Sequence, residues 1–97
     1  MDAKKARERL TRERADLAGT VARLRERLAV PQRDDVARQA MFEARIGLID
    51  EALTRLERGE YGRCVICRRP IPEERLELLP ETPFCVEDAA REQARAQ

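Results

Sequence analysis

The sequence contains no histidine and no tryptophan, and only one tyrosine and two phenylalanines among its 97 residues. Without histidine, catalysis and metal binding by imidazole are excluded. Twenty basic and nineteen acidic side chains leave a net charge of +1, so the chain lacks the positive balance of proteins that bind nucleic acid mainly through phosphate contacts. With 40% charged residues, a chain this short has too little apolar material for a large core or a roomy substrate pocket.

Long apolar runs are also missing. No stretch of about 18 apolar residues exists that would span a membrane, and the N-terminus is charged where a signal peptide would be apolar. We therefore expect a cytoplasmic protein. The three cysteines are an odd number, which argues against a closed set of disulfides. In a reducing compartment, a Cys-x-x-Cys pair more often indicates metal binding or redox chemistry.

Apolar residues recur at heptad spacing in the first part of the chain, where residues 3–30 contain no proline. Leu10, Leu17 and Leu24 form this seam, which predicts a helix over 3–30. Pro31 is expected to end it, because proline lacks a backbone donor and restricts the residue before it.

A second helix is predicted from Asp34 to Arg58, with a matching seam of Phe42, Ile46, Ile49, Leu53 and Leu56. A connection this short between two long helices folds them back on each other. We therefore predict that residues 1–60 form an antiparallel helical hairpin, a coiled coil within one chain, with its tip near residues 30–37.

The charges of the two arms support this pairing. Residues 1–33 carry ten basic and five acidic groups, a balance of +5, and residues 34–60 carry four and seven, a balance of -3. Such charges select a partner while the apolar seam provides most of the stability. An intramolecular hairpin should be monomeric. The same heptads would also suit a structural coiled-coil oligomer, which periodicity alone leaves open.

The pattern changes at Gly59, where glycines at 59 and 62 predict a helix C-cap and a turn. Residues 61–97 contain all three cysteines and four of the five prolines, and we predict a separate compact module. Its tail from Val86 has helix-forming composition, which predicts a C-terminal helix docked on the module. The expected fold class is mainly α: a hairpin attached to a small zinc-finger-like globule with a C-terminal helix.

Four residues of this module have the spacing of a tetrahedral zinc site. Cys64 and Cys67 are followed after seventeen residues by Cys85, and Asp88 comes three positions later. The pattern fits the template for two ligand pairs on one ion, with a carboxylate in the last position. Because a carboxylate is a harder donor than a thiolate, affinity for zinc should be lower than with four cysteines.

Two alternatives remain open for these cysteines. Without metal, the cysteines would act as small apolar residues inside a core of Ile66, Ile71, Leu76, Leu78, Phe84 and Val86. A thioredoxin-like redox role is the weaker alternative, because the sequence does not alternate strands and helices.

The chain reads ALTRLERGEYGRCVIC from Ala52 to Cys67, followed by Pro70-Ile71-Pro72, Arg75-Leu76-Glu77, Pro80 and Cys85. This combination resembles the DksA/TraR family of bacterial RNA polymerase-binding regulators, whose signature joins an ALxRLExGxYGxCxxC run to an IPxxRLExxP stretch and a closing cysteine pair. The resemblance implies a helical hairpin that projects from a zinc-finger globule. It also implies a protein that binds polymerase and not DNA.

In detail the likeness extends from Ala37 to Asp88, and upstream it concerns architecture alone. In that family the hairpin enters the secondary channel of polymerase, and an Asp-x-Ala at its tip acts near the catalytic centre. Asp35 and Ala37 match this motif, and Asp34 precedes it. From the residues alone, Asp34 can instead cap the second helix, with Asp35 favourably placed at the positive end of its dipole.

The sequence departs from the family pattern at several positions. Asp88 replaces the last cysteine, Arg68 replaces the glycine that usually follows the first cysteine pair, and the arm is shorter than in long members. Long members respond to the alarmone ppGpp through basic residues at positions that are Leu79 and Ala89 here. Because a highly charged nucleotide binds weakly without such cations, we expect little dependence on ppGpp bound to this protein.

The leading hypothesis is therefore a non-enzymatic transcription regulator. A second hypothesis is a Gre-like factor that stimulates transcript cleavage, in which Asp34 and Asp35 help polymerase hold a metal ion. A third is a zinc-ribbon nucleic-acid binder that uses Arg63, Arg68, Arg69 and Arg75 around Tyr61. Interleaved glutamates cancel much of that charge, and a single aromatic ring is a poor platform for base stacking.

Overall fold

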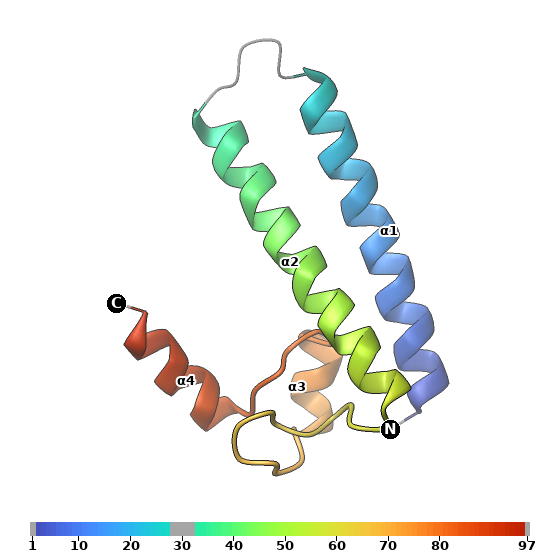
Figure 1. The fold of residues 1–97 in the computed structure, drawn as a ribbon, viewed down its shortest axis with the longest axis vertical. Coiled ribbons are helices and arrows are strands. Elements are labelled where there is room, and N and C mark those ends of the chain that lie inside the picture. The colour runs from blue at the N-terminus through green and yellow to red at the C-terminus, as the bar shows by residue number, and fades with distance from the viewer. Residues whose placement is uncertain (1, 28–32, 97) are drawn as a thin grey trace.

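The computed structural model describes residues 2–27 and 33–96. These residues contain four helices: α1 (Ala3–Arg27), α2 (Arg33–Glu57), α3 (Glu73–Leu78) and α4 (Val86–Arg95). α1 and α2 run antiparallel and project together from the part of the molecule that contains α3 and α4 (Figure 1). In the described part of the chain there is no strand, only an isolated bridge between Arg63 and Pro70. None of these helices combines the length and apolar character needed to cross a membrane.

The molecule is elongated. Its longest dimension is 46 Å and its radius of gyration is 15.1 Å, whereas a compact domain of this length would have a radius of gyration of about 12.5 Å. The difference comes from the hairpin, because a helix of 25 residues is about 38 Å long. The predicted mainly α fold with a projecting antiparallel hairpin is confirmed (Figure 1).

The helix boundaries lie close to the predicted ones. α1 begins at Ala3, where the Asp2 carboxylate accepts hydrogen bonds from the backbone N–H groups of Lys4 (2.9 Å) and Lys5 (3.3 Å). The predicted end of this helix at Pro31 lies outside the described residues. α2 covers 33–57 and is thus displaced by one residue from the predicted 34–58.

α2 ends in the predicted glycine cap. Gly59 has φ of 71°, a left-handed conformation that glycine adopts at little cost. The Gly59 N–H donates to the Leu56 carbonyl (3.2 Å), and the Glu60 N–H donates to the Arg55 carbonyl (2.9 Å). This pair of bonds is a Schellman motif, which satisfies carbonyls that the helix end would leave without donors.

The hairpin core is strongest near the base. Leu10, Ile49 and Ala52 have no exposed surface, and Leu56 is also buried. Nearer the tip, Val21 and Leu24 of α1 are buried, whereas the predicted seam residues Phe42 and Ile46 of α2 are only half-buried. The hairpin is consequently anchored at its base more firmly than near its tip.

Two charged pairs connect the arms in the sense that the charge balance of the arms predicts. Arg14 Nε lies 2.5 Å from Asp50 Oδ1, and Arg25 pairs with Glu43. In both pairs α1 supplies the cation and α2 the anion. Because all four side chains are substantially exposed, these pairs select the partner arm and add little to the stability of the hairpin.

The module has a smaller core, made of Cys64, Ile71 and Leu76. Phe84 packs against it and is half-buried. The alternative core proposed for a metal-free module is wrong in part: Ile66, Leu78 and Val86 are 51%, 79% and 57% exposed. These residues follow the path of a loop and the outer faces of short helices, so their apolar character does not bring them inside.

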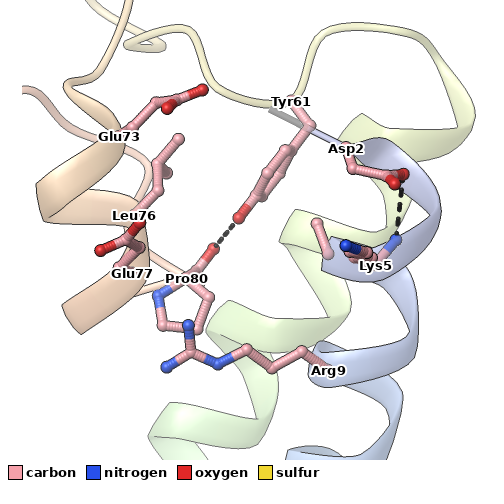
Figure 2. A pocket seen from close by; sticks show the side chains of 9 residues that line it. Asp2, Lys5, Arg9, Tyr61, Glu73, Leu76, Glu77 and Pro80 are labelled. Atoms are coloured by element: carbon pink, nitrogen blue, oxygen red, sulfur yellow. Dashed lines mark hydrogen bonds between the residues drawn. The ribbon is translucent and has the colours of Figure 1, made fainter.

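Tyr61 joins the two parts of the molecule. Its ring packs against both the hairpin core and the module core, and its hydroxyl donates to the Pro80 carbonyl at 2.9 Å (Figure 2). Burial raises the pKa of this phenol. Beside Tyr61, a cavity of about 260 Å³ lies between α1 and α3, with Lys5 and Arg9 on one side and Glu77 on the other.

Arg45 makes a second connection. Its Nε lies 3.3 Å from Oε2 of Glu81, which follows α3, and its Nη2 lies 3.4 Å from Oε2 of Glu13 on α1. Glu81 is 5% exposed. Arg45 therefore links both hairpin arms to the module.

Candidate metal centre and hairpin tip

The first half of the candidate metal centre is the loop from Cys64 to Cys67. The Cys64 N–H donates to the Arg69 carbonyl (2.9 Å), and the Arg68 N–H donates to the Cys64 carbonyl (3.0 Å), which closes the chain into a tight turn. Arg68 has φ of 66° and is the one residue other than glycine with positive φ among those described. A left-handed conformation costs about 1–2 kcal/mol for a residue with a Cβ, which explains why a glycine would suit position 68.

The second half lies at the N-terminus of α4. Cys85 is the N-cap residue, and its sulfur accepts a hydrogen bond from the Asp88 N–H at 3.4 Å. The cap and the first helical turn thereby place the Cys85 and Asp88 side chains on the same side of α4. Asp88 is 2% exposed although it is charged.

All four predicted ligand residues meet at one point. One ligand atom from each of Cys64, Cys67, Cys85 and Asp88 lies within 4.8 Å of all the others. The sulfurs of Cys67 and Cys85 are 3.8 Å apart, and two thiolates bound tetrahedrally to one zinc ion are about 3.8 Å apart. Asp88 Oδ2 lies 3.1 Å from the Cys64 sulfur and 3.3 Å from the Cys85 sulfur. The residues therefore fit a zinc ion, and relative to these two sulfurs the carboxylate oxygen needs to move outward by a few tenths of an ångström.

The thiols and the carboxylate interact strongly in the absence of metal. Hydrogen bonds from Cys64, Cys67 and Cys85 lower the pKa of Asp88 to about 2. The pKa of Cys67 is raised to about 11: the Arg69 N–H lowers it, but burial and the hydrogen bonds with Asp88 and the other thiols outweigh that effect. Cys67 is thus protonated at neutral pH without metal, and metal binding must displace its proton.

One contact of this cluster could not be read from the ligand pattern. Asp88 Oδ1 accepts a hydrogen bond from Arg91 Nη1 at 3.1 Å. The spacing of three residues on a helix is the sequence signal for such a pair, but Arg91 is not part of the ligand pattern itself.

The predicted tip residues lie in and just after the first turn of α2. Asp34 and Ala37 are exposed, and Asp35 is half-buried. Because α2 begins at Arg33, Asp34 lies inside the helix and not at the capping position expected for it. Neither aspartate forms an ion pair with any described residue. The predicted tip segment 30–32 lies outside the described residues.

The residues of the zinc-ribbon alternative are less available than their sequence positions suggest. Arg75 Nε donates to the Phe84 carbonyl at 3.0 Å and is half-buried, so it holds the module together. The Tyr61 ring lies between the two cores. Arg63, Arg68 and Arg69 are exposed.

Parts of the chain are similar in sequence to known proteins. The family described as prokaryotic dksA/traR C4-type zinc finger matches residues 59–94. An uncharacterized protein from Aquifex aeolicus (strain VF5) is 46% identical over 41 residues, which are 42% of this chain and 28% of that protein. The chain thus spans little more than a quarter of the length of that relative.

Nearly the whole length of this chain is similar to solved structures. Transcription factor DksA2 from Pseudomonas aeruginosa is 28% identical with a TM-score of 0.72, over 97% of this chain and 84% of that one. The DnaK suppressor protein from Agrobacterium tumefaciens C58 is 26% identical with a TM-score of 0.73, over 94% of each chain. The regulator Dks from Chlamydia trachomatis, at 21% identity with a TM-score of 0.55 and 92% coverage of each chain, shares the fold.

Proposed function

We propose that this chain, which belongs to the DksA/TraR family, is a transcription regulator that binds RNA polymerase and inserts its hairpin into the secondary channel. The observation that carries the proposal is the projecting hairpin, with carboxylates near its far end that pair with no described residue. Insertion would alter the stability of promoter complexes. The protein would act in the cytoplasm, as a monomer, without catalysing a reaction of its own.

The dimensions of the hairpin support this mode of action. Two antiparallel helices packed side by side form a rod about 20 Å wide, and the arm is about 38 Å long. Only the end of such a rod reaches a recessed site, so the chemistry would be delivered by Asp34, Asp35 and Ala37. The first-turn aspartates are also stabilised by the positive end of the α2 dipole, which keeps their charge favourable on a narrow tip.

The metal centre would have a structural role. We propose that Cys64, Cys67, Cys85 and Asp88 bind zinc through four protein ligands, which leaves no open position for a substrate. When bound, the zinc ion would supply a crosslink. Through its four protein ligands, the Cys64–Cys67 loop would be tied to the first turn of α4. Tyr61 then holds this assembled module against the hairpin base.

Regulation by ppGpp would depend little on this protein. Leu79 at the end of α3 is 44% exposed, and Ala89 lies half-buried in α4. Neither side chain offers a cation to a phosphate, and a polyphosphate needs several charge-assisted hydrogen bonds. A large ppGpp effect that is abolished by substitutions in this protein, but not by substitutions in polymerase, would contradict this part of the proposal.

In vitro transcription with purified polymerase tests the tip. Asp35→Asn removes the charge at constant shape, and Asp16→Asn is the matched control on the exposed shaft of α1. We expect the Asp35 variant to bind polymerase normally and to lose its effect on promoter complexes, while the Asp16 variant behaves as wild type. An Asp35→Asn variant with full activity would refute delivery of a tip carboxylate.

The Gre-like alternative is favoured by one observation: Asp34 and Asp35 are adjacent and form no ion pair with any residue that the structure describes. Paused elongation complexes discriminate between the two functions. If the protein shortens the transcript from its 3′ end, the cleavage function is supported. If only initiation changes, the regulator is supported and the cleavage function fails.

A further inference from the structure

The two oxygens of the Asp88 carboxylate have different partners. Oδ2 lies among the thiols, 3.1 Å from the Cys64 sulfur and 3.3 Å from the Cys85 sulfur. Oδ1 points the other way and accepts from Arg91 Nη1 at 3.1 Å. The Asp88 side chain is 3% exposed, whereas the Arg91 side chain is 74% exposed. A buried carboxylate is thus fixed between the metal cluster and a cation at the surface.

We propose that Arg91 is a positioning residue for the metal centre, and that Asp88 and Arg91 together take the place of a fourth cysteine. The inference rests on the proposed zinc site. A thiolate offers one donor atom, but a carboxylate has two equivalent oxygens and a broad, nearly two-fold terminal torsion. The hydrogen bond to Oδ1 removes that freedom and leaves Oδ2 directed at the thiols.

Charge gives Arg91 a second role at the same place. Three thiolates and one carboxylate around a divalent ion leave a net double negative charge. Arg91 is the cation that contacts this ligand set directly, through Asp88. Outer partners that orient and polarise a metal ligand typically change metal affinity by about 10–100-fold when they are removed.

The attachment of α4 depends on the same contact. Among the described helices, only α1 and α2 pack against each other, and Asp88 is the buried residue of α4. α4 is therefore joined to the module chiefly through Cys85 and Asp88. If Arg91 fixes Asp88, its removal should loosen α4 as well as the metal.

The chain contains a matched control for an ordinary surface ion pair. Arg95 Nη1 lies 2.9 Å from Glu92 Oε1, with the same spacing of three residues on the same helix, and neither residue is a candidate ligand. Both arginines are strongly exposed. Arg91→Gln and Arg95→Gln thus each remove one ion pair between residues three apart on α4. The carboxylate of the Arg91 pair is 3% exposed and belongs to the metal cluster, whereas that of the Arg95 pair is 36% exposed and does not.

The test measures metal binding by the full chain. Zinc affinity is obtained by competition with a chromophoric chelator, and the ligand set is followed in the absorption spectrum of the cobalt(II) form. We expect Arg91→Gln to lower zinc affinity by about 10–100-fold and Arg95→Gln to change it by less than about twofold. Arg91→Lys should restore part of the loss, and hydrogen exchange of α4 amides should rise only in the Arg91→Gln variant.

Asp88→Cys provides the second variant. With a single sulfur donor at position 88, the orienting effect of Arg91 should disappear and Arg91→Gln should lower zinc affinity much less, so the two substitutions should be strongly non-additive. Equal zinc affinities for Arg91→Gln and Arg95→Gln in the native background would overturn the role of Arg91 and leave the zinc site intact. Failure of the wild-type chain to bind zinc would refute the site itself.

Discussion

The hairpin and the module are stabilised in different ways. In the hairpin, Leu10, Ile49 and Ala52 meet along a seam between two helices of 25 residues each, and no ion is needed to bring them together. In the module, the core has three residues, and one of them, Cys64, is a candidate metal ligand. A core this small supplies little of the free energy that an ordered loop region requires.

The difference shows how one short chain combines a rigid arm with a compact base. Long helices generate buried surface from a regular pattern, so the arm can extend far from the rest of the molecule. The module has short helices and long loops, so a crosslink must replace part of the missing core. The two parts have separate cores, but Tyr61 packs against both and so connects them mechanically.

The largest expected effect comes from removing a candidate ligand. Cys67 is exposed and outside the module core, so Cys67→Ala tests metal binding with little change in packing. We expect zinc affinity to fall by more than about 100-fold, while the far-ultraviolet circular dichroism of α1 and α2 persists. Loss of the whole helical signal would show that the hairpin depends on the metal and would break the comparison.

The next effect concerns the hairpin core. Leu10→Ala creates a cavity at a fully buried position and should lower the free energy of unfolding by about 2–5 kcal/mol. Urea denaturation followed by circular dichroism measures this change. The half-buried Leu17 provides the control, because Leu17→Ala should cost less. Zinc affinity should stay near the wild-type value, and a loss comparable to that of Cys67→Ala would contradict the separation of the two parts.

A smaller effect is expected at the connection between the two regions. Tyr61→Phe keeps the ring in both cores but leaves the Pro80 carbonyl without its donor. The free energy of unfolding should fall by about 0.5–1.5 kcal/mol, with a modest decrease in zinc affinity because the module is held less firmly. A change confined entirely to one region would show that Tyr61 does not couple them.

The smallest effect appears only in strong alkali. Burial raises the pKa of Tyr61 above its ordinary value of 10.0, because the folded state favours the neutral phenol. This contribution to stability is complete below pH 10 and is lost as the pH rises through the higher pKa of the folded protein. Ultraviolet titration of the single tyrosine should give a midpoint above 10.0 in the folded protein and near 10.0 in denaturant. Equal midpoints would show that the Tyr61 phenol is exposed to solvent in the folded protein.

The fold of the hairpin could be predicted from sequence because its cause is periodic. Leucines seven residues apart in α1 and Gly59 at the end of α2 predict the described helices to within a few residues. The ligand cluster could be predicted from the spacing of its cysteines, because side chains that bind one metal ion must lie close together. Both inferences use patterns that are local or repeated.

The remaining features depend on three-dimensional context that no spacing records. Ile66, Leu78 and Val86 are apolar but exposed, because a loop and the ends of short helices do not impose a consistent inner face. Arg75 proved to be a structural residue that binds the Phe84 carbonyl, which its charge alone does not reveal. A hydrogen bond between a side chain and a distant backbone carbonyl leaves no periodic pattern in the sequence.

Tyr61 has a practical consequence as the sole tyrosine of a chain without tryptophan. Its intrinsic fluorescence arises at the boundary between hairpin and module, next to the cavity lined by Lys5 and Arg9 (Figure 2). Any rotation of the arm relative to the base changes the surroundings of this one emitter. The intrinsic fluorescence of Tyr61 therefore reports on the orientation of the hairpin relative to the module, without an added label.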